Sequence, residues 1–151
     1  MIRRLTIYIL FTFTYFISAQ KYNFINYTIE DGLPESQVYA VTQGDDGYLY
    51  LGVNGGGITR FDGIHFENIS VSEGLPAGTA YMVIKDHDGN LWFSTDRGIL
   101  KYNNSGYRNY DYNDGILSYN NWSLTEGENG NIYVGCDEGI SVITKDSVFT
   151  I

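Results

Sequence analysis

The sequence predicts an all-β protein assembled from a repeated unit of four short antiparallel strands. Aromatic residues make up 16% of the 151-residue chain, and 14 of them are Tyr, a residue that favours strands. The chain holds 18 Gly but only two Pro, and several Gly residues follow Asp or Asn, as in tight turns. The third observation is an internal repeat that covers most of the chain.

Three sets of glycines recur along the sequence with a common period. Within each set the glycines are about 41 or 42 residues apart, which is typical of propeller repeats. The sets are Gly32, Gly74 and Gly115; Gly47, Gly89 and Gly130; and Gly57, Gly98 and Gly139. Three landmarks that keep one period indicate three copies of one structural unit.

Each unit is predicted to contain four strands joined by turns. In the first unit, Asp45-Asp46-Gly47 is a hairpin turn, because Asp and Gly tolerate positive φ. The strands of that unit are expected over residues 38–43, 48–53, 58–61 and 65–69. Four antiparallel strands in sequence form a propeller blade, and closed propellers have about four to eight of them. Blades over about 38–69, 80–112 and 121–151 therefore predict an incomplete β-propeller, and an extra outer strand without a blade is expected over 22–28.

The first residues are predicted to be a secretory signal peptide rather than part of the fold. A basic start, Met1-Ile2-Arg3-Arg4, precedes an apolar run over 5–17 and the small residues Ser18 and Ala19. The run is short for a membrane span, although an uncleaved anchor stays open as an alternative. We expect a signal peptide over 1–19, and an exported propeller segment over 20–151 that is periplasmic or at the cell surface.

Composition excludes several classes of function. The net charge of −9 and the pI near 4.4 disfavour nucleic-acid binding, which usually needs a basic patch. Cys136 is the only cysteine, and His65 and His87 are the only histidines, so the sequence nominates no catalytic residue, no cofactor and no His/Cys metal site. Asp86-His87-Asp88-Gly89 resembles the start of a calcium loop, but Arg97 stands where a late acidic ligand is needed, which favours a hairpin turn.

The repeat resembles the two-component regulator propeller repeat. Glu30-Asp31-Gly32-Leu33-Pro34 and the segment Gly89-Asn90-Leu91-Trp92-Phe93-Ser94-Thr95 carry the resemblance. Three positions depart from the family pattern. Tyr50 and Tyr133 stand where the family has Trp, Ile116-Leu117 stands where it has Leu-Pro, and Cys136 stands where it has Thr.

The resemblance implies the periplasmic sensor domain of hybrid two-component histidine kinases of the Bacteroidetes type. The expected function is a non-catalytic, ligand-sensing module of a signalling system, for glycans or their breakdown products. The membrane helix and kinase that such sensors also carry have no counterpart in this sequence. The alternative is a self-assembling structural or carbohydrate-binding propeller module.

Aromatic residues supply the candidate ligand-binding site. Tyr81, Tyr119 and Trp122 stand where the chain enters the second and third blades, near the face at which propellers usually bind. Tyr50, Trp92 and Tyr133 occupy one repeat position and are expected to pack between blades instead. The expected partners are a small molecule or oligosaccharide and further blades, either in the same chain or in a second copy. Without further blades, two inter-blade faces stay bare, so residues 20–151 alone are expected to be marginally stable or to aggregate.

Overall fold

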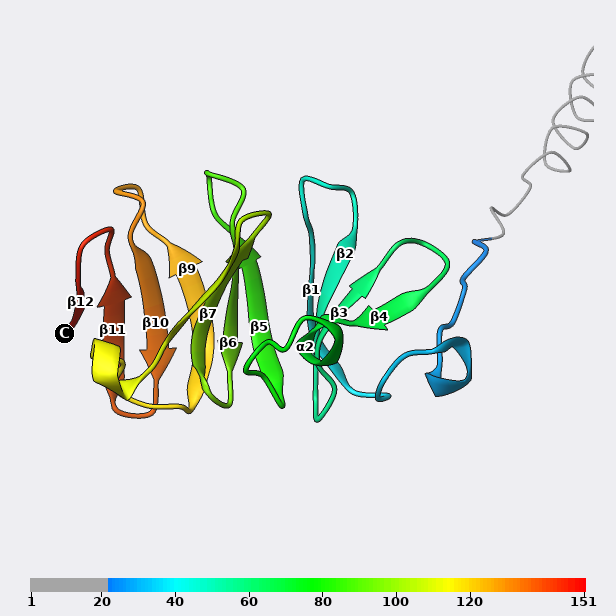
Figure 1. Ribbon diagram of the computed structural model, residues 1–151, viewed down its shortest axis with the longest axis horizontal. Coiled ribbons are helices and arrows are strands. Elements are labelled where there is room, and N and C mark those ends of the chain that lie inside the picture. The colour runs from blue at the N-terminus through cyan, green and yellow to red at the C-terminus, as the bar shows by residue number, and fades with distance from the viewer. Residues whose placement is uncertain (1–21) are drawn as a thin grey trace, which may run out of the picture.

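The computed structural model describes residues 22–151, so the predicted signal peptide over 1–19 lies outside the described residues. Three separate four-stranded antiparallel sheets stand side by side in chain order (Figure 1). Within each sheet the strands also follow one another in sequence. The predicted all-β fold of three propeller blades, arranged as an open row, is confirmed.

The strand bounds follow the repeat. The first blade comprises β1 (Val38–Gln43), β2 (Leu49–Val53), β3 (Gly57–Phe61) and β4 (Phe66–Asn68). The second comprises β5 (Ala80–Lys85), β6 (Leu91–Thr95), β7 (Gly98–Asn103) and β8 (Gly106–Tyr110). The third comprises β9 (Asn121–Glu126), β10 (Ile132–Cys136), β11 (Gly139–Ile143) and β12 (Val148–Thr150).

The turn between the first two strands has the same conformation in every blade. Gly47, Gly89 and Gly130 have φ values of 87°, 83° and 76°, a region that disfavours residues with a Cβ. In the second blade the Gly89 amide donates to the Asp86 carbonyl at 3.0 Å. The hairpin interpretation of Asp86–Gly89 is thereby confirmed.

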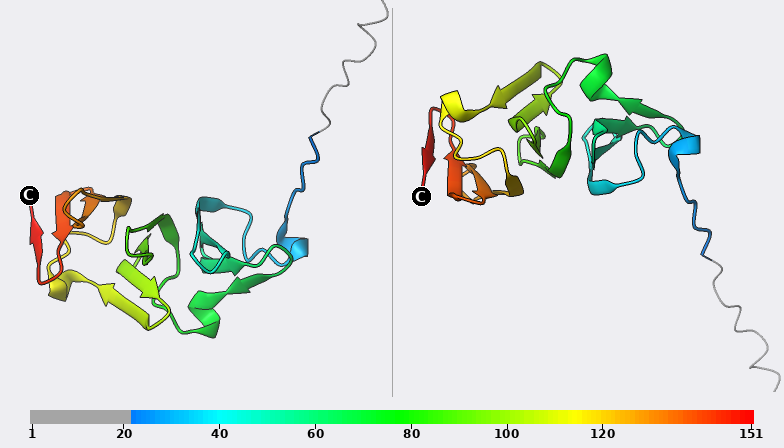
Figure 2. Two further views of the ribbon diagram at one scale, coloured as in Figure 1. Left: turned by 90° about the horizontal axis from the view of Figure 1, so that it is seen from above. Right: turned by 90° about the horizontal axis from the view of Figure 1, so that it is seen from below.

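The inner strands converge and the outer strands spread apart. β1 contacts β5, and β5 contacts β9, whereas β4, β8 and β12 fan out on the other side (Figure 2). Within residues 22–151, no helix is long and apolar enough to cross a membrane.

The core lies between the blades. Tyr50 and Ile58 of the first blade pack against Val83 and Phe93 of the second. Trp92 of the second blade packs against the third in the same way. Tyr50 and Trp92 are 2% and 4% exposed, as the prediction of inter-blade packing requires. Tyr133 is only half-buried, because no blade follows the third among the described residues.

Two segments differ from the sequence prediction. The expected strand over 22–28 is wrong, because these residues form no strand. A strand needs a neighbour for its backbone hydrogen bonds, and the segment instead packs Tyr27 edge-on against Phe61 and Phe66. The fourth strand of the first blade also ends at Asn68, because the Asn68 side chain accepts from the Val71 amide and caps the short helix α2 (Ile69–Ser72).

Candidate ligand-binding face

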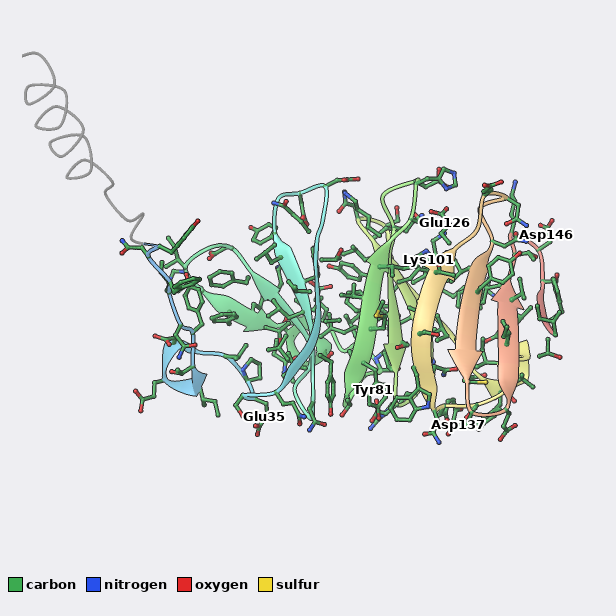
Figure 3. All side chains as sticks on the ribbon, turned by 180° about the vertical axis from the view of Figure 1, so that it is seen from behind. Glu35, Tyr81, Lys101, Glu126, Asp137 and Asp146 are labelled. Atoms are coloured by element: carbon green, nitrogen blue, oxygen red, sulfur yellow. The ribbon has the colours of Figure 1, made fainter. Side chains whose placement is uncertain are left out.

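The row of blades has two chemically different ends. At one, which we call the loop end, the inner strands begin and the β2–β3, β6–β7 and β10–β11 turns gather. At the other, the hairpin end, the inner strands run into the β1–β2, β5–β6 and β9–β10 turns. Figure 3 shows Tyr81 and Asp137 at the loop end and Glu126 and Asp146 at the hairpin end.

Three aromatic side chains form a continuous row at the loop end. Tyr39, Tyr81 and Trp122 come from β1, β5 and β9, at the same repeat position relative to the turn glycines. The ring centroids of Tyr39 and Tyr81 are 5.8 Å apart, and those of Tyr81 and Trp122 are 5.3 Å apart. Tyr39 and Trp122 are 43% and 56% exposed, so the aromatic row offers ring surface to solvent.

Two carboxylates lie on the turns next to the row, and one of them holds the indole of Trp122. Trp122 donates its indole N–H to Asp137 Oδ1 at 2.6 Å, and Asn120 donates its side-chain amide to Asp137 Oδ2 at 2.9 Å. Asp96, at the equivalent position of the second blade, accepts from the backbone amides of Gly78 and Thr79. These bonds leave the flat ring of Trp122 as its free contact surface.

The hydroxyl of Tyr81 is held in its protonated form. Partial burial, the negative charge of Asp96 and the neighbouring Tyr39 raise the pKa of the Tyr81 phenol above its ordinary value. At neutral pH this hydroxyl can therefore both donate and accept a hydrogen bond. The loop end thus combines apolar ring faces with a hydroxyl and two carboxylates.

The structure brings together two of the three aromatic residues that the sequence nominated. Tyr81 and Trp122 are neighbours, whereas Tyr119 packs against Tyr112 with ring centroids 4.3 Å apart. Tyr39 was not among the residues predicted from the sequence. The repeat register could have identified it, since Tyr39 precedes Gly47 by the same number of residues as Tyr81 precedes Gly89.

The two histidines lie away from the aromatic row, whereas the one cysteine lies beside the β10–β11 turn at the loop end. His87 contacts Glu126 at the hairpin end, and His65 lies in the β3–β4 turn beside Asp62. The Cys136 thiol donates to the Gly139 carbonyl, with the sulfur 3.3 Å from the oxygen. Among residues 22–151, no three His, Cys, Asp or Glu side chains are grouped so that they could hold a metal ion.

Solved structures share the fold of this chain. It resembles the extracellular domain of a proposed hybrid two component system from B. thetaiotaomicron, with 22% identity and a TM-score of 0.78. That match covers 89% of this chain but only 19% of the other, so the chain spans about a fifth of the larger domain's length. Virginiamycin B lyase from Staphylococcus aureus is also similar, with 22% identity and a TM-score of 0.57, over 79% of this chain and 43% of the lyase. At this identity, both likenesses show the fold alone.

Sequence comparison adds the family of the repeat. No curated protein matches the chain in sequence. Residues 74–97, however, match the family described as two component regulator propeller. The matched segment runs from Gly74-Leu75-Pro76 through β5 and β6 to the turn that follows β6. The resemblance seen in the sequence is therefore confirmed, and the segment that matches the two component regulator propeller family lies in the middle blade.

Proposed function

We propose that this chain is a non-catalytic, ligand-sensing propeller module of a two-component signalling system, which binds glycans or their breakdown products through the aromatic row. The observation that carries the proposal is that Tyr81 contacts both Tyr39 and Trp122, from equivalent positions of three blades. The match of residues 74–97 to two component regulator propellers supports the sensing role.

The chemistry of the aromatic row suits a sugar. Tyr and Trp present a large, rigid apolar face together with a polar group, and they recur at binding surfaces for that reason. A pyranose ring has an apolar C–H face that can lie on such a ring and hydroxyl groups around its edge. Asp137 and Asp96 provide acceptors for those hydroxyls beside Trp122 and Tyr81.

Binding would act by changing how blades pack. We infer that the module is exported to the periplasm or cell surface, where free oligosaccharides are met. A ligand that spans Tyr81 and Trp122 contacts β5 and β9 together, so it favours one relative arrangement of these blades. Such a preference is what a sensor needs in order to shift a population of states.

Titration calorimetry of the full chain against an oligosaccharide panel tests the proposal. Of the two tryptophans, Trp92 is 4% and Trp122 56% exposed, so a ligand-induced change in fluorescence reports mainly on Trp122. Tyr81→Ala should weaken binding about tenfold or more, as loss of an aromatic anchor does. Tyr107→Ala, at an exposed Tyr on the outer strand β8, is the matched control and should leave affinity unchanged. Absence of binding across the panel, or an equal loss in both variants, would refute the glycan site.

The non-catalytic part of the proposal has a separate readout. The imidazole of His87 is engaged by Glu126 at the hairpin end, whereas Tyr81 lies at the loop end (Figure 3). We therefore expect every oligosaccharide that binds to be recovered intact after prolonged incubation, as chromatography of the mixture would show. Release of a cleaved or unsaturated product would contradict this part.

A further inference from the structure

An ionic contact at the hairpin end recurs between successive blades. Between the first and second blades, Lys85 Nζ lies 2.7 Å from Asp45 Oδ1. Between the second and third, His87 contacts the carboxylate of Glu126 through its ring, and its backbone amide donates to Glu126 at 2.9 Å. We call each contact an inter-blade latch.

The two latches use identical repeat positions. Asp45 and His87 each stand two residues before the turn glycine of their own blade. Lys85 and Glu126 each stand four residues before the turn glycine of the next blade. In the first latch the earlier blade supplies the acid and the later blade the base, and in the second latch the order is reversed. The two latches therefore share the positions of their side chains but not the order of their charges.

The third blade carries one half of a further latch. Glu128 is the residue equivalent to Asp45 and His87, it is exposed, and it has no ion pair or hydrogen bond within residues 22–151. At the opposite end of the same blade, near the β10–β11 turn, Ile140 is 40% exposed. The equivalent Ile99 of the second blade packs against the third blade and is completely buried. The face of the third blade that carries Ile140 is therefore built to pack against another blade.

The first blade carries the complementary half. Gln43 is the residue equivalent to Lys85 and Glu126. Beside it, Val41 and Leu49 are 59% and 36% exposed, although the equivalent Val83 and Leu91 of the second blade are 5% and 4% exposed. Leu33, from the segment before β1, covers the outer part of this face around Phe61 and leaves the inner part open.

We propose that a second copy of this chain docks head to tail, with the open face of its first blade on the third blade and Gln43 opposite Glu128. The chain's own two interfaces supply the template for this contact, because the same repeat positions meet in each. The amide of Gln43 can donate to the carboxylate of Glu128. Two copies contain six blades, a number within the usual range of closed propellers, so the head-to-tail contact can close into a ring.

Sedimentation velocity of the full chain over a wide concentration range tests this contact. The sedimentation coefficient should rise with concentration towards that of a two-copy species. Gln43→Lys creates an ion pair with Glu128 and should strengthen association about two- to fivefold at low salt, with the gain lost at high salt. Gln43→Glu should weaken association by a similar factor.

A charge exchange makes the test specific to the proposed pair. Gln43→Glu combined with Glu128→Lys should restore association, because the two charges again have opposite signs. Ile140→Asp should abolish association, whereas Val71→Asp, at a 79%-exposed position on α2, should leave it unchanged. Far-ultraviolet circular dichroism verifies that each variant is folded, and the exposed positions of Gln43 and Glu128 keep the test independent of folding.

Three results would overturn the proposal. The first is a single monomeric species at every concentration. The second is an equal response to Gln43→Lys and Gln43→Glu, since only an opposing carboxylate distinguishes the two. The third is failure of the charge exchange to restore association, which would place another part of the chain against the third blade.

Discussion

The middle blade and the two end blades carry the same kinds of side chain at the same repeat positions but bury them very differently. Val83 of the middle blade is 5% exposed, whereas the equivalent Val41 of the first blade is 59% exposed. Ile99 is completely buried, and the equivalent Ile140 of the third blade is 40% exposed. Neither residue identity nor strand register differs within these pairs. Burial in this fold is therefore decided by the neighbouring blade.

A second contrast concerns the aromatic residue of the second strand. In the end blades this residue is Tyr50 or Tyr133, and a Cβ on the nearby Gly44 or Gly127 would come within 2.8 or 2.7 Å of the Tyr ring. In the middle blade the equivalent of these glycines is Asp86, which accepts from Trp92 Nε1 at 2.7 Å. At this packing position the end blades therefore combine Tyr with Gly, whereas the middle blade combines Trp with Asp.

The sharpest test of the first contrast is a matched pair of truncations. Ile99→Ala leaves a cavity between the second and third blades and should lower the free energy of unfolding by about 2–5 kcal/mol. Ile140→Ala, at the equivalent position of the third blade, should cost less than about 1 kcal/mol, because the side chain is partly solvated already. Urea unfolding at low protein concentration measures both. Equal costs would show that the two positions do not differ in burial in solution.

Substitution of Asp86 should lower the free energy of unfolding by less than Ile99→Ala does. Asp86→Gly removes the acceptor of the Trp92 indole and of the Asn90 amide, and leaving these buried donors unpaired should cost about 1–3 kcal/mol. Adding Trp92→Tyr recreates the Tyr and Gly combination of the end blades and should recover part of the loss. Urea midpoints of the two single variants and the double variant provide the comparison. A double variant that is as unstable as the sum of the singles would contradict the pairing.

The loss caused by Asp86→Gly should also depend on pH. Burial raises the pKa of Asp86, but hydrogen bonds from Trp92 and Asn90, with the charge of Lys101, outweigh it and leave the pKa below its ordinary value. A carboxyl with a lowered folded-state pKa stabilises the fold above its unfolded-state pKa of about 4, and this contribution disappears as the pH falls through the folded-state value. The original chain and the variant should therefore differ most near neutral pH and converge in acid.

The smallest expected effect is the pH dependence of the latch that contains His87. The hydrogen bond to Glu126, with the charge of Asp88, raises the pKa of His87 above its ordinary value. The latch between the second and third blades is therefore complete below about pH 6.5 and weakens as the pH rises through the raised pKa. The latch between Lys85 and Asp45 contains no histidine.

Substitution of the carboxylate partner tests this difference. In an NMR titration, Glu126→Gln should move the pKa of His87 back towards its ordinary value. Asp88→Asn should produce a smaller change in the same direction, because Asp88 acts through its charge alone. A pKa that Glu126→Gln leaves unchanged would show that this latch is not formed in solution.

The sequence by itself determined the strands and hairpin turns, because these form between segments that are adjacent in the chain. The repeat period predicted three units of four strands, and the structure has this arrangement within residues 22–151. A hairpin needs only alternating strands and a glycine such as Gly89 with positive φ. The expected strand over 22–28 was wrong because strand pairing depends on a partner that the local sequence does not reveal. The aromatic row shows the same division. Tyr81 and Trp122 were predicted from their place in the repeat. Only the convergence of β1, β5 and β9 shows that Tyr39 packs beside Tyr81, and only the structure shows that Tyr119 packs against Tyr112. Contacts across blades join residues about 40 positions apart, and it is the packing of whole sheets that decides which of them meet.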